Sequence, residues 1–417
     1  MRTIRLGTTG GTGPWTWSSG SRGRRPAHGH AGALIRAWTR RRLDSPQART
    51  RTPPDMPNPV IKTAQHLVRM LLPKPMATPV DMSGRHVIVT GASPGSLGYE
   101  TARILASWGA TVVATRVRDV SLMEAALKDD LRKGGADEDN LTAHALDLSD
   151  THSVNAFATW YRDRHRGKLH VLVNNAGIHS KTLAPRTETP LTGDGFEVHW
   201  RTNYLGAFHL TWALLPLLQR TGIESGDARV VNVSSGLHER VGNTDLFGYD
   251  DLFGEGPDRH QPHGDRPQHH LPHGDRPQRH RPPRDRPRYH SWDAYGRSKL
   301  AMNHMAFEIE RRFAESHSLH GVAVHPGVVM TNLTLPQTFE GWIGKAVHRI
   351  SSALASLVLL SPNAGAQTIV MCASQRPLQG GRYYERCAVA EPSADSLDAD
   401  ASKRLWEQSE QWVGTLV

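Results

Sequence analysis

The run HVIVTGASPGSLGYETARILASWGATVVAT, residues 86–115, decides the fold of this chain. It opens with a short apolar run typical of a buried strand and continues into a glycine-rich turn. A helical pattern then leads to a second β-rich run. This order predicts two parallel strands joined by a helix. Glycines between strand and helix let the backbone approach a pyrophosphate, whose charge meets free N–H groups at the helix start.

The same alternation continues along the chain. More β-rich runs stand at residues 170–174, 229–233 and 322–325, and helical patterns stand at 99–108, 120–132, 153–164 and 208–219. Apolar strands that alternate with helices predict an α/β fold, in which helices cover both faces of a doubly wound parallel sheet to give three layers. Ligands of such a sheet bind beyond the carboxyl ends of its strands.

The positive charge of the chain lies mostly outside this pattern. Of the formal net charge of +10, residues 1–55 account for +9 and residues 256–290 for +4, which leaves −3 for the remainder. A mildly acidic body gives little support to nucleic-acid binding, so no nucleic acid is expected as a partner.

Composition divides the chain into a tail, a lead-in and one folded domain. Residues 1–55 are rich in Gly, Arg, Ser, Thr and Pro and are expected to be a disordered basic extension, with Met56 or Met76 as a sensible alternative start. The lead-in, residues 56–82, has apolar residues at helical spacing over 59–72. They predict a short amphipathic helix that packs on the domain or rests on a membrane surface, and packing is favoured. Residues 83–417 form the domain.

A repeat interrupts this domain at residues 257–288. Its frame P-x-x-D-R-P recurs every ten residues, starting at Pro262, Pro272 and Pro282. Proline at this frequency excludes a helix or an inner strand. Seven histidines lie between residues 260 and 290, which raises metal binding, but nothing fixes their geometry as ligands. We therefore expect a disordered insertion and no metal site.

Cysteine usage and hydropathy bear on the compartment. The chain has two cysteines, Cys372 and Cys387, which cannot make a disulfide framework or a cysteine metal site and which fit a reducing compartment. No stretch reaches the length of a membrane-spanning helix without charge. We expect a soluble cytoplasmic protein, and a peripheral membrane contact stays open.

Tyr295 and Lys299 are the first candidates for chemistry, because residues four apart share one face of a helix. An unperturbed tyrosine titrates at about 10, so a tyrosine that exchanges protons near neutrality needs a cation beside its phenolate. Lys299 can be that cation. The alternative is a packed ring beside a solvated charge.

The end of the second strand bears on cofactor choice. Arg116 stands where an acidic residue would accept the ribose hydroxyls of NAD, and Arg118 is close by. A guanidinium there can pair with a 2′-phosphate, which favours NADP and leaves NAD open. A solvated surface arginine is the alternative.

From about residue 83 to 415 the chain resembles the short-chain dehydrogenase/reductases, and within them the retinol-dehydrogenase-like branch and its bacterial relatives. The turn Thr90–Gly98 is similar to the family's T-G-x-x-x-G-x-G, with one extra residue before Gly98. Tyr295 and Lys299 match its Y-x-x-x-K. The resemblance implies a Rossmann-type fold with a single catalytic domain.

The resemblance also implies a role for each matching residue. It places a catalytic set at Asn203, Ser235, Tyr295 and Lys299. The serine would bind the substrate oxygen, the tyrosine would act as general acid or base, the lysine would hold the nicotinamide ribose and the asparagine would position a water. The residues implied for cofactor binding are Gly91, Ser93, Gly95, Leu97, Gly98, Arg116, Asp147, Leu148, Asn174, Ala176, Gly177, Tyr295, Lys299, Pro326, Gly327, Val328 and Thr331.

The function that this resemblance implies is NADP-dependent interconversion of an alcohol and a carbonyl by hydride transfer. The apolar segment 342–360 suits a small hydrophobic alcohol, aldehyde or ketone, although core packing explains it about equally well. The alternative is a non-catalytic NADP-binding or scaffold protein whose basic tail and loop bind an acidic partner, and the intact catalytic set argues against it. A homo-oligomer stays open.

Overall fold

The structure, a computed structural model, describes residues 75–165, 167–179, 189–246, 289–327 and 360–416. Contacts within the chain divide it into two units, residues 1–65 and 66–417, and all described residues belong to the second. Several predictions concern segments outside the described residues. These are the basic extension 1–55, the helix expected at 59–72, the insertion 257–288, the apolar segment 342–360 apart from its last residue, and Val328 and Thr331.

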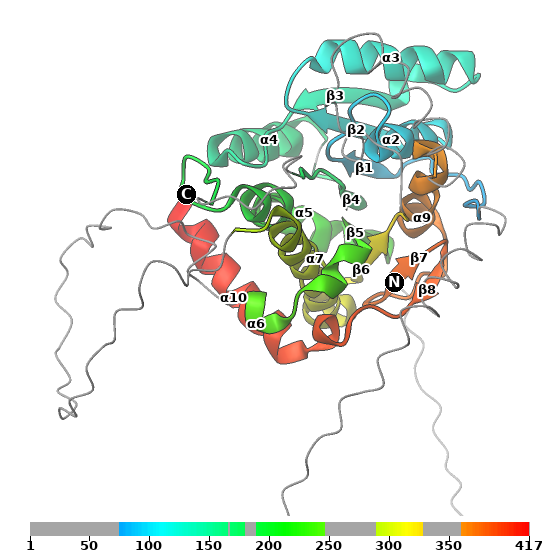
Figure 1. Cartoon of the computed structure of the whole chain (residues 1–417). Coiled ribbons are helices and arrows are strands. Elements are labelled where there is room, and N and C mark those ends of the chain that lie inside the picture. Colours follow the sequence, from blue (N-terminus) through cyan, green and yellow to red (C-terminus); the bar gives the residue numbers. More distant parts are fainter. Residues whose placement is uncertain (1–74, 166, 180–188, 247–288, 328–359, 417) are drawn as a thin grey trace, which may run out of the picture. The chain divides into compact units, whose positions relative to one another are not determined.

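An eight-stranded sheet forms the centre of the second unit (Figure 1). Its strands are β1 (His86–Val89), β2 (Thr111–Arg116), β3 (Leu141–Ala145), β4 (Val171–Asn174), β5 (Ala228–Val233), β6 (Leu319–His325), β7 (Tyr383–Glu385) and β8 (Ala388–Ala390). They lie in the order β3-β2-β1-β4-β5-β6-β7-β8. Every neighbouring pair is parallel except β7 and β8. The strand order reverses between β1 and β4, which is where sheets of this kind bind ligands.

The inner strands are apolar along their whole length because both faces of the sheet are covered. Every residue of β4 and β5 is buried. Successive residues of β1 enter different hydrophobic clusters, with Val87 and Val89 in one and Ile88 in the other. Since side chains alternate across a strand, the two clusters lie on opposite faces of the sheet.

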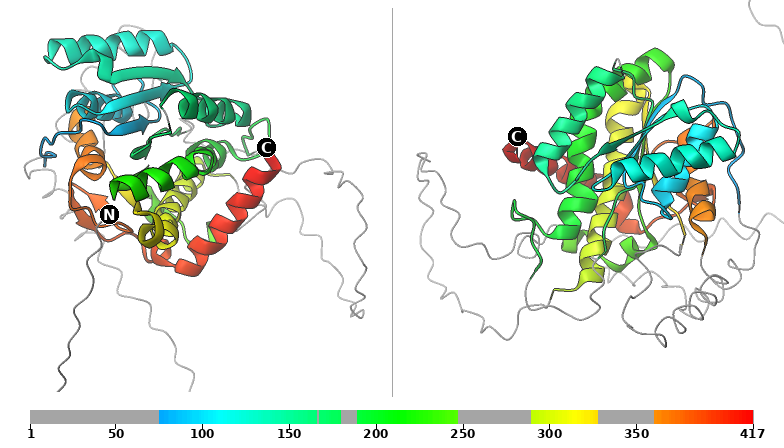
Figure 2. Two further views of the ribbon diagram at one scale, coloured as in Figure 1. Left: turned by 180° about the vertical axis from the view of Figure 1, so that it is seen from behind. Right: turned by 90° about the horizontal axis from the view of Figure 1, so that it is seen from above.

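Helices cover both of these faces, as Figure 2 shows. They are α2 (Leu97–Ser107), α3 (Val120–Lys133), α4 (Thr151–Arg164), α5 (Gly206–Ser225), α6 (Asn243–Leu246), α7 (Ser291–His317), α9 (Pro362–Ser374) and α10 (Ala399–Leu416). Buried residues of α2, α3 and α9 pack in one cluster, and those of α4, α5, α7 and α10 pack in the other. The predicted three-layer, doubly wound fold is confirmed.

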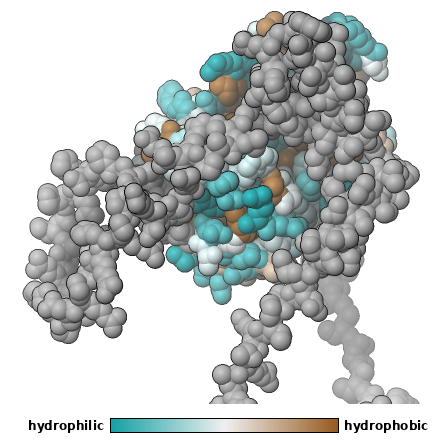
Figure 3. Space-filling view, viewed as in Figure 1, coloured by the Kyte–Doolittle hydropathy of each residue, from teal (hydrophilic) through white to brown (hydrophobic). Residues whose placement is uncertain are grey.

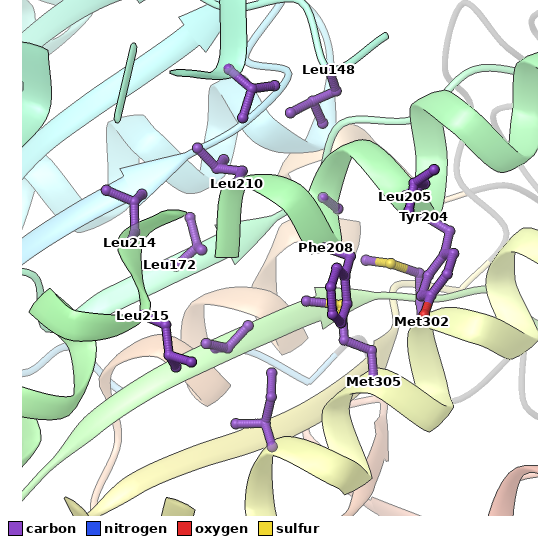
Figure 4. Packing of buried hydrophobic residues seen from close by; sticks show 14 of the residues in the cluster. Leu148, Leu172, Tyr204, Leu205, Phe208, Leu210, Leu214, Leu215, Met302 and Met305 are labelled. Carbon is purple, nitrogen blue, oxygen red and sulfur yellow. The ribbon is translucent and has the colours of Figure 1, made fainter. Parts of the chain in front are cut away.

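Close packing between α5 and α7 fixes the position of α7. In Figure 4, Phe208 of α5 lies against Met302 and Met305 of α7, all within one hydrophobic cluster. On the outside of these two helices lies α10, whose Trp406 ring stands 4.9 Å from that of Phe208 and 5.9 Å from that of Phe313. The helix that carries the predicted catalytic tyrosine is therefore held from both sides.

Three strands were not among the β-rich runs that the sequence shows. In β3, only Leu141 of five residues is fully buried, because β3 lies at one edge of the sheet. The strands β7 and β8 have three residues each, and β8 is half-exposed or exposed along its length. Short or edge strands carry little of the apolar pattern on which such predictions depend.

The described surface is of mixed character (Figure 3). The exposed large hydrophobic residues include Leu122 on α3, Ile223 on α5 and Leu397 before α10, so they stand on separate elements. Among the described helices, none is both long enough and apolar enough to cross a membrane.

Candidate active site

Tyr295 and Lys299 share one face of α7, as their spacing predicts. The Nζ atom of Lys299 lies 5.5 Å from the centre of the Tyr295 ring. Lys299 is 3% exposed, and Tyr295 is half-buried. A buried ammonium this close to a phenol ring favours negative charge on that phenol when the amine is protonated.

Ser235 meets this pair from the end of β5. Its backbone is extended, with φ −158° and ψ 151°, and it begins the 3₁₀ turn Gly236–Arg240. Its hydroxyl accepts a hydrogen bond from the backbone N–H of Leu237 at 3.3 Å and also hydrogen-bonds with the Tyr295 side chain. Burial raises the pKa of Tyr295 to about 12, and the hydrogen bond with Ser235 acts in the opposite direction.

Lys299 is anchored to the same strand. Its Nζ donates a hydrogen bond to the carbonyl of Val233 at 2.8 Å. Burial lowers the pKa of Lys299 to about 8, so the amine changes charge close to neutrality. Gly177, which follows β4, lies beside it, since a Cβ added there would stand 3.4 Å from Nζ.

Asn203 lies in a one-turn π-helix, Trp200–Leu205, that leads into α5. Its Oδ1 accepts from the backbone N–H of Ile178 at 2.7 Å, and its Nδ2 donates to the Ile178 carbonyl at 3.0 Å and to the Ser298 hydroxyl at 3.1 Å. These bonds join the loop after β4 to α7. Insertions of this helical type are frequent at functional sites, but no sequence pattern marks them in advance.

Glycines let the turn after β1 pack closely against the segment after β4 and against its own backbone. A Cβ added to Gly91 would lie 2.7 Å from Cα of Ala176, and one added to Gly98 would lie 2.6 Å from the Gly91 carbonyl oxygen. Gly91 and Gly95 also have positive φ angles, of 72° and 73°. The backbone can follow this path only with glycine at these positions. A turn of this shape, leading into the start of α2, fits a dinucleotide pyrophosphate.

Ser96 caps α2, a role that the motif match does not reveal. Its hydroxyl accepts from the N–H of Tyr99 at 3.2 Å and donates to the Gly91 carbonyl at 3.3 Å. Ser93 and Leu97, both predicted to bind cofactor, are half-buried in the same turn. The cap therefore holds the turn and the helix start in one arrangement.

The segment after β4 braces the glycine-rich turn. Asn175 donates from Nδ2 to the carbonyls of Thr90 and Gly91 at 2.7 Å and 3.2 Å. The Thr90 hydroxyl in turn accepts from the N–H groups of Asn175 and Ala176, both at 3.0 Å. Asn174 points the other way, into the core, and donates to Thr211 and Asn232. Its predicted cofactor contact has no support from this orientation and stays a prediction.

The predicted adenine side of the site lies at the ends of β2 and β3. Arg116 ends β2 and is 3.5 Å from the Asp119 carboxylate, with a side chain 20% exposed. Asp147 is half-buried and accepts from the N–H and hydroxyl of Ser149 at 2.9 Å and 2.6 Å. Leu148 packs inside the core (Figure 4), and its carbonyl accepts from buried Arg201 at 2.6 Å.

The end of β6 supplies the last predicted cofactor residues. Pro326 and Gly327 directly follow the strand and are half-buried. Their predicted partners in that motif, Val328 and Thr331, lie outside the described residues.

An aromatic wall beside Tyr295 was missed by sequence reasoning. The His179 ring lies 4.0 Å from Trp292 and 5.1 Å from Tyr295, to which it is perpendicular. Burial, helped by nearby His199, lowers the pKa of His179 to about 4, so its ring is neutral near pH 7. A single histidine without a ligand spacing carries no signal in a sequence.

Behind this wall lies a buried polar cluster of Glu197, His199 and Tyr289. Nδ1 of His199 is 2.7 Å from the Glu197 carboxylate, and the Tyr289 hydroxyl donates to the same oxygen at 2.7 Å. Burial raises the pKa of Glu197, but the hydrogen bonds from His199 and Tyr289 outweigh burial and lower it overall. Among the described residues, no group of three or more His, Cys, Asp or Glu side chains could hold a metal ion.

A family model described as short chain dehydrogenase matches residues 85–249. The chain is 34% identical over 334 residues to polyprenol dehydrogenase of Mus musculus, which covers 79% of this chain and 84% of that protein. It is 32% identical over 355 residues to retinol dehydrogenase 11 of Homo sapiens, covering 84% and 92%. A solved RhlG/NADP active-site complex of Pseudomonas aeruginosa is 21% identical, covers 73% of this chain and 96% of that one, and gives a TM-score of 0.49.

Proposed function

This chain belongs to the short-chain dehydrogenase/reductase family, and on that premise we propose that it interconverts an alcohol and a carbonyl on a hydrophobic substrate, with a preference for NADP. Membership makes it an NAD(P)-dependent oxidoreductase of the retinol-dehydrogenase-like branch that acts on CH–OH groups. The preference for NADP, the substrate class and the residue roles below are the proposal.

One observation carries the proposal: Ser235, Tyr295 and Lys299 converge beside the glycine-rich turn. The Ser235 hydroxyl bonds to the Tyr295 side chain, and Lys299 lies 5.5 Å from that ring. Ser235 then donates a hydrogen bond to the substrate oxygen, while Tyr295 gives a proton to that oxygen in reduction and removes it in oxidation. A phenol with a pKa of about 12 stays protonated near neutrality, so it is ready to donate.

The residues that would hold the cofactor follow or lie near the carboxyl ends of the parallel strands. The turn from Gly91 to Gly98 and the start of α2 would hold the pyrophosphate, Lys299 would bind the nicotinamide ribose, and Arg116 would bind the adenine ribose phosphate. The bound dinucleotide supplies or accepts the hydride. Asn203 holds the loop that separates Lys299 from the turn, and its predicted water-positioning role is part of the proposal.

Two relatives support a hydrophobic substrate through their names, polyprenol dehydrogenase and retinol dehydrogenase 11. Both names refer to long apolar alcohols. The aromatic wall of His179 and Trp292 beside Tyr295 offers an apolar surface at the reacting group.

The direct test is cofactor consumption on a carbonyl panel. We expect NADPH absorbance to fall with apolar aldehydes, ketones or retinal, while Tyr295→Phe binds NADPH normally and loses about 10²- to 10⁴-fold in kcat. Tyr161→Phe is the matched control, because it removes the hydroxyl of a buried tyrosine on α4. This variant should keep the kcat of the parent. Near-normal turnover of Tyr295→Phe would sink the assignment.

Cofactor preference has its own test at Arg116. Loss of a charge-assisted hydrogen bond costs roughly 1.5–3 kcal/mol, so Arg116→Ala should weaken NADPH binding by about ten- to a hundredfold and leave NADH nearly unchanged. Arg118→Ala, whose side chain is exposed two residues later, is the control. Equal losses for both cofactors in Arg116→Ala would contradict a phosphate-binding role.

A further inference from the structure

His238 joins the predicted catalytic serine to a distant part of the chain. It lies in the turn directly after Ser235 and is completely buried. Its Nδ1 is 2.6 Å from the Ser235 carbonyl oxygen, and its Nε2 is 3.0 Å from the backbone nitrogen of Ser393. Both ring nitrogens therefore have a main-chain partner, one of them in the serine itself.

These two contacts fix the tautomer of the ring. A backbone N–H can only donate, so Nε2 of His238 must be the acceptor from Ser393. The proton is then on Nδ1, which donates to the Ser235 carbonyl. If the proton moved to Nε2, both bonds would be lost at once. The bond to Ser393 thus controls the bond to Ser235.

The segment that begins at Ser393 also holds the helix of Tyr295. We define the C-terminal clamp as residues 393–402. On α7, Asn303 donates to the Ser396 hydroxyl at 3.1 Å, and Nδ1 of His304 is 2.7 Å from the Ser402 hydroxyl. The clamp therefore contacts both the turn that follows Ser235 and the helix that carries Tyr295.

A further set of bonds ties the clamp to the residues just after the serine turn. The backbone N–H of Asn243 donates to the Asp395 carboxylate at 3.1 Å, and its Nδ2 donates to the Asp395 carbonyl at 3.1 Å. Its Oδ1 is 2.9 Å from Nε2 of His304. Asn243 thus links the clamp, α6 and α7 in one polar network.

We propose that His238 is a positioning residue. By bonding to both the C-terminal clamp and Ser235, it couples the position of the clamp to that of Ser235 and so orients the serine hydroxyl toward Tyr295. The proposal rests on the function proposed above for Ser235. Ser235 has an extended backbone, and its carbonyl accepts from two groups of His238, the backbone N–H at 3.0 Å and Nδ1 at 2.6 Å, so the position of His238 bears directly on that of Ser235.

Proline at position 393 breaks the decisive bond. Ser393 has a φ of −59°, which the proline ring allows, and Ser393→Pro replaces the N–H donor with a Cδ atom that pushes against Nε2 of His238. Ser393→Ala is the matched control, because it also loses the hydroxyl that contacts Ser396 but keeps the N–H. We expect Ser393→Pro to lose about tenfold or more in kcat while its NADPH Kd stays within about twofold. Ser393→Ala should stay close to the parent.

The pH dependence of kcat is a second measurement, which a purely structural effect of the substitution would leave unchanged. Burial lowers the pKa of His238, although the Ser235 carbonyl and then Glu239 act to raise it. The other titratable groups beside it are His304 of α7 and Tyr383 of β7, whose ring lies 5.2 Å from that of His238. In the parent and in Ser393→Ala, protonation of Nε2 displaces the Ser393 N–H, so kcat should fall on the acid side as His238 takes up a proton. In Ser393→Pro that bond is already absent, so this acid limb should be missing.

A second pair of variants covers the case in which Ser393→Pro does not fold. His238→Gln keeps one donor and one acceptor, whereas His238→Leu keeps only apolar volume. We expect the glutamine variant to retain clearly more kcat than the leucine variant at equal NADPH affinity. Equal kcat values within both pairs would overturn the proposal. Full turnover of Ser235→Ala would instead remove the proposed role of the serine itself, so the two failures are distinguishable.

Discussion

Lys299 shows how the proposed site works against the stability of the fold at the scale of one residue. Its amine is 3% exposed and bonds only to a main-chain carbonyl among the contacts described, at 2.8 Å. A pKa lowered from 10.5 to about 8 corresponds to roughly 3 kcal/mol against burying the charged form. The unfolded chain binds the proton more tightly, so the folded state gains stability as pH rises from about 8 toward 10.5.

Lys299→Met should therefore abolish turnover and yet stabilise the protein. Below pH 8 we expect an unfolding free energy about 1–2 kcal/mol above the parent, since the lost bond to Val233 offsets part of the gain. The difference should shrink as pH rises above 8, where the parent loses its buried charge. Urea titrations at pH 7 and 9.5 measure both values, with exposed Lys403→Met as the control. A constant difference across this range would contradict the buried-charge explanation.

At the scale of one element, α10 completes the face of the molecule formed by α5 and α7. Trp406 is 2% exposed and meets Phe208, Phe313 and, by a cation–π contact at 5.2 Å, Arg312. The Tyr204 hydroxyl bonds to the Ser409 hydroxyl at 2.7 Å. This helix therefore belongs to the hydrophobic core rather than to the surface.

Truncation of the Trp406 side chain tests whether α10 belongs to the hydrophobic core. Trp406→Ala removes a large buried ring and should lower the unfolding free energy by about 3–5 kcal/mol. Lys403→Ala, an exposed change on the same helix, should alter it by less than about 0.5 kcal/mol. Chemical denaturation of the two variants provides the comparison. A loss below about 1 kcal/mol for Trp406→Ala would mean that α10 is not part of the core.

Some elements and site residues could be predicted from the sequence, and others could not. The runs at 86–90 and 229–233 predicted β1 and β5 because buried parallel strands are apolar throughout. Tyr295 and Lys299 could be paired from spacing, since a helix has a fixed period. His179, His199 and His238 could not be found, because each has a decisive partner far away in sequence that only the folded chain brings near. These partners are Trp292, Tyr289 and Ser393 in turn. Asn174 had a motif but points into the core.

At the scale of the whole molecule, the insertion 257–288 joins two points that the fold holds firmly. Leu246 before it is completely buried in the core. Tyr289 after it is 6% exposed and bonds to Glu197. Since loop-closure entropy grows only with the logarithm of length, anchored ends of this kind tolerate long insertions.

Excising residues 257–288 should therefore leave the fold and cofactor binding intact. Shortening the connection should change the unfolding free energy by about 1 kcal/mol at most, in the stabilising direction. NADPH affinity should stay within about twofold of the parent, as measured by fluorescence titration. The full-length chain serves as control. An insoluble product would show that the insertion takes part in the structure.

The sheet order has a consequence for synthesis. The strands β1 to β4 occupy contiguous positions on one side of the sheet and are complete once residue 174 has been made. The clamp, by contrast, consists of residues near 400. Ser235 is linked to it through His238, which accepts a hydrogen bond from Ser393. The N-terminal part of a chain leaves the ribosome first, and a domain generally folds as a unit. The glycine-rich turn is thus synthesised early, whereas the clamp that we propose to position Ser235 is synthesised near the end, so the proposed chemistry could begin only after almost the entire chain had been translated.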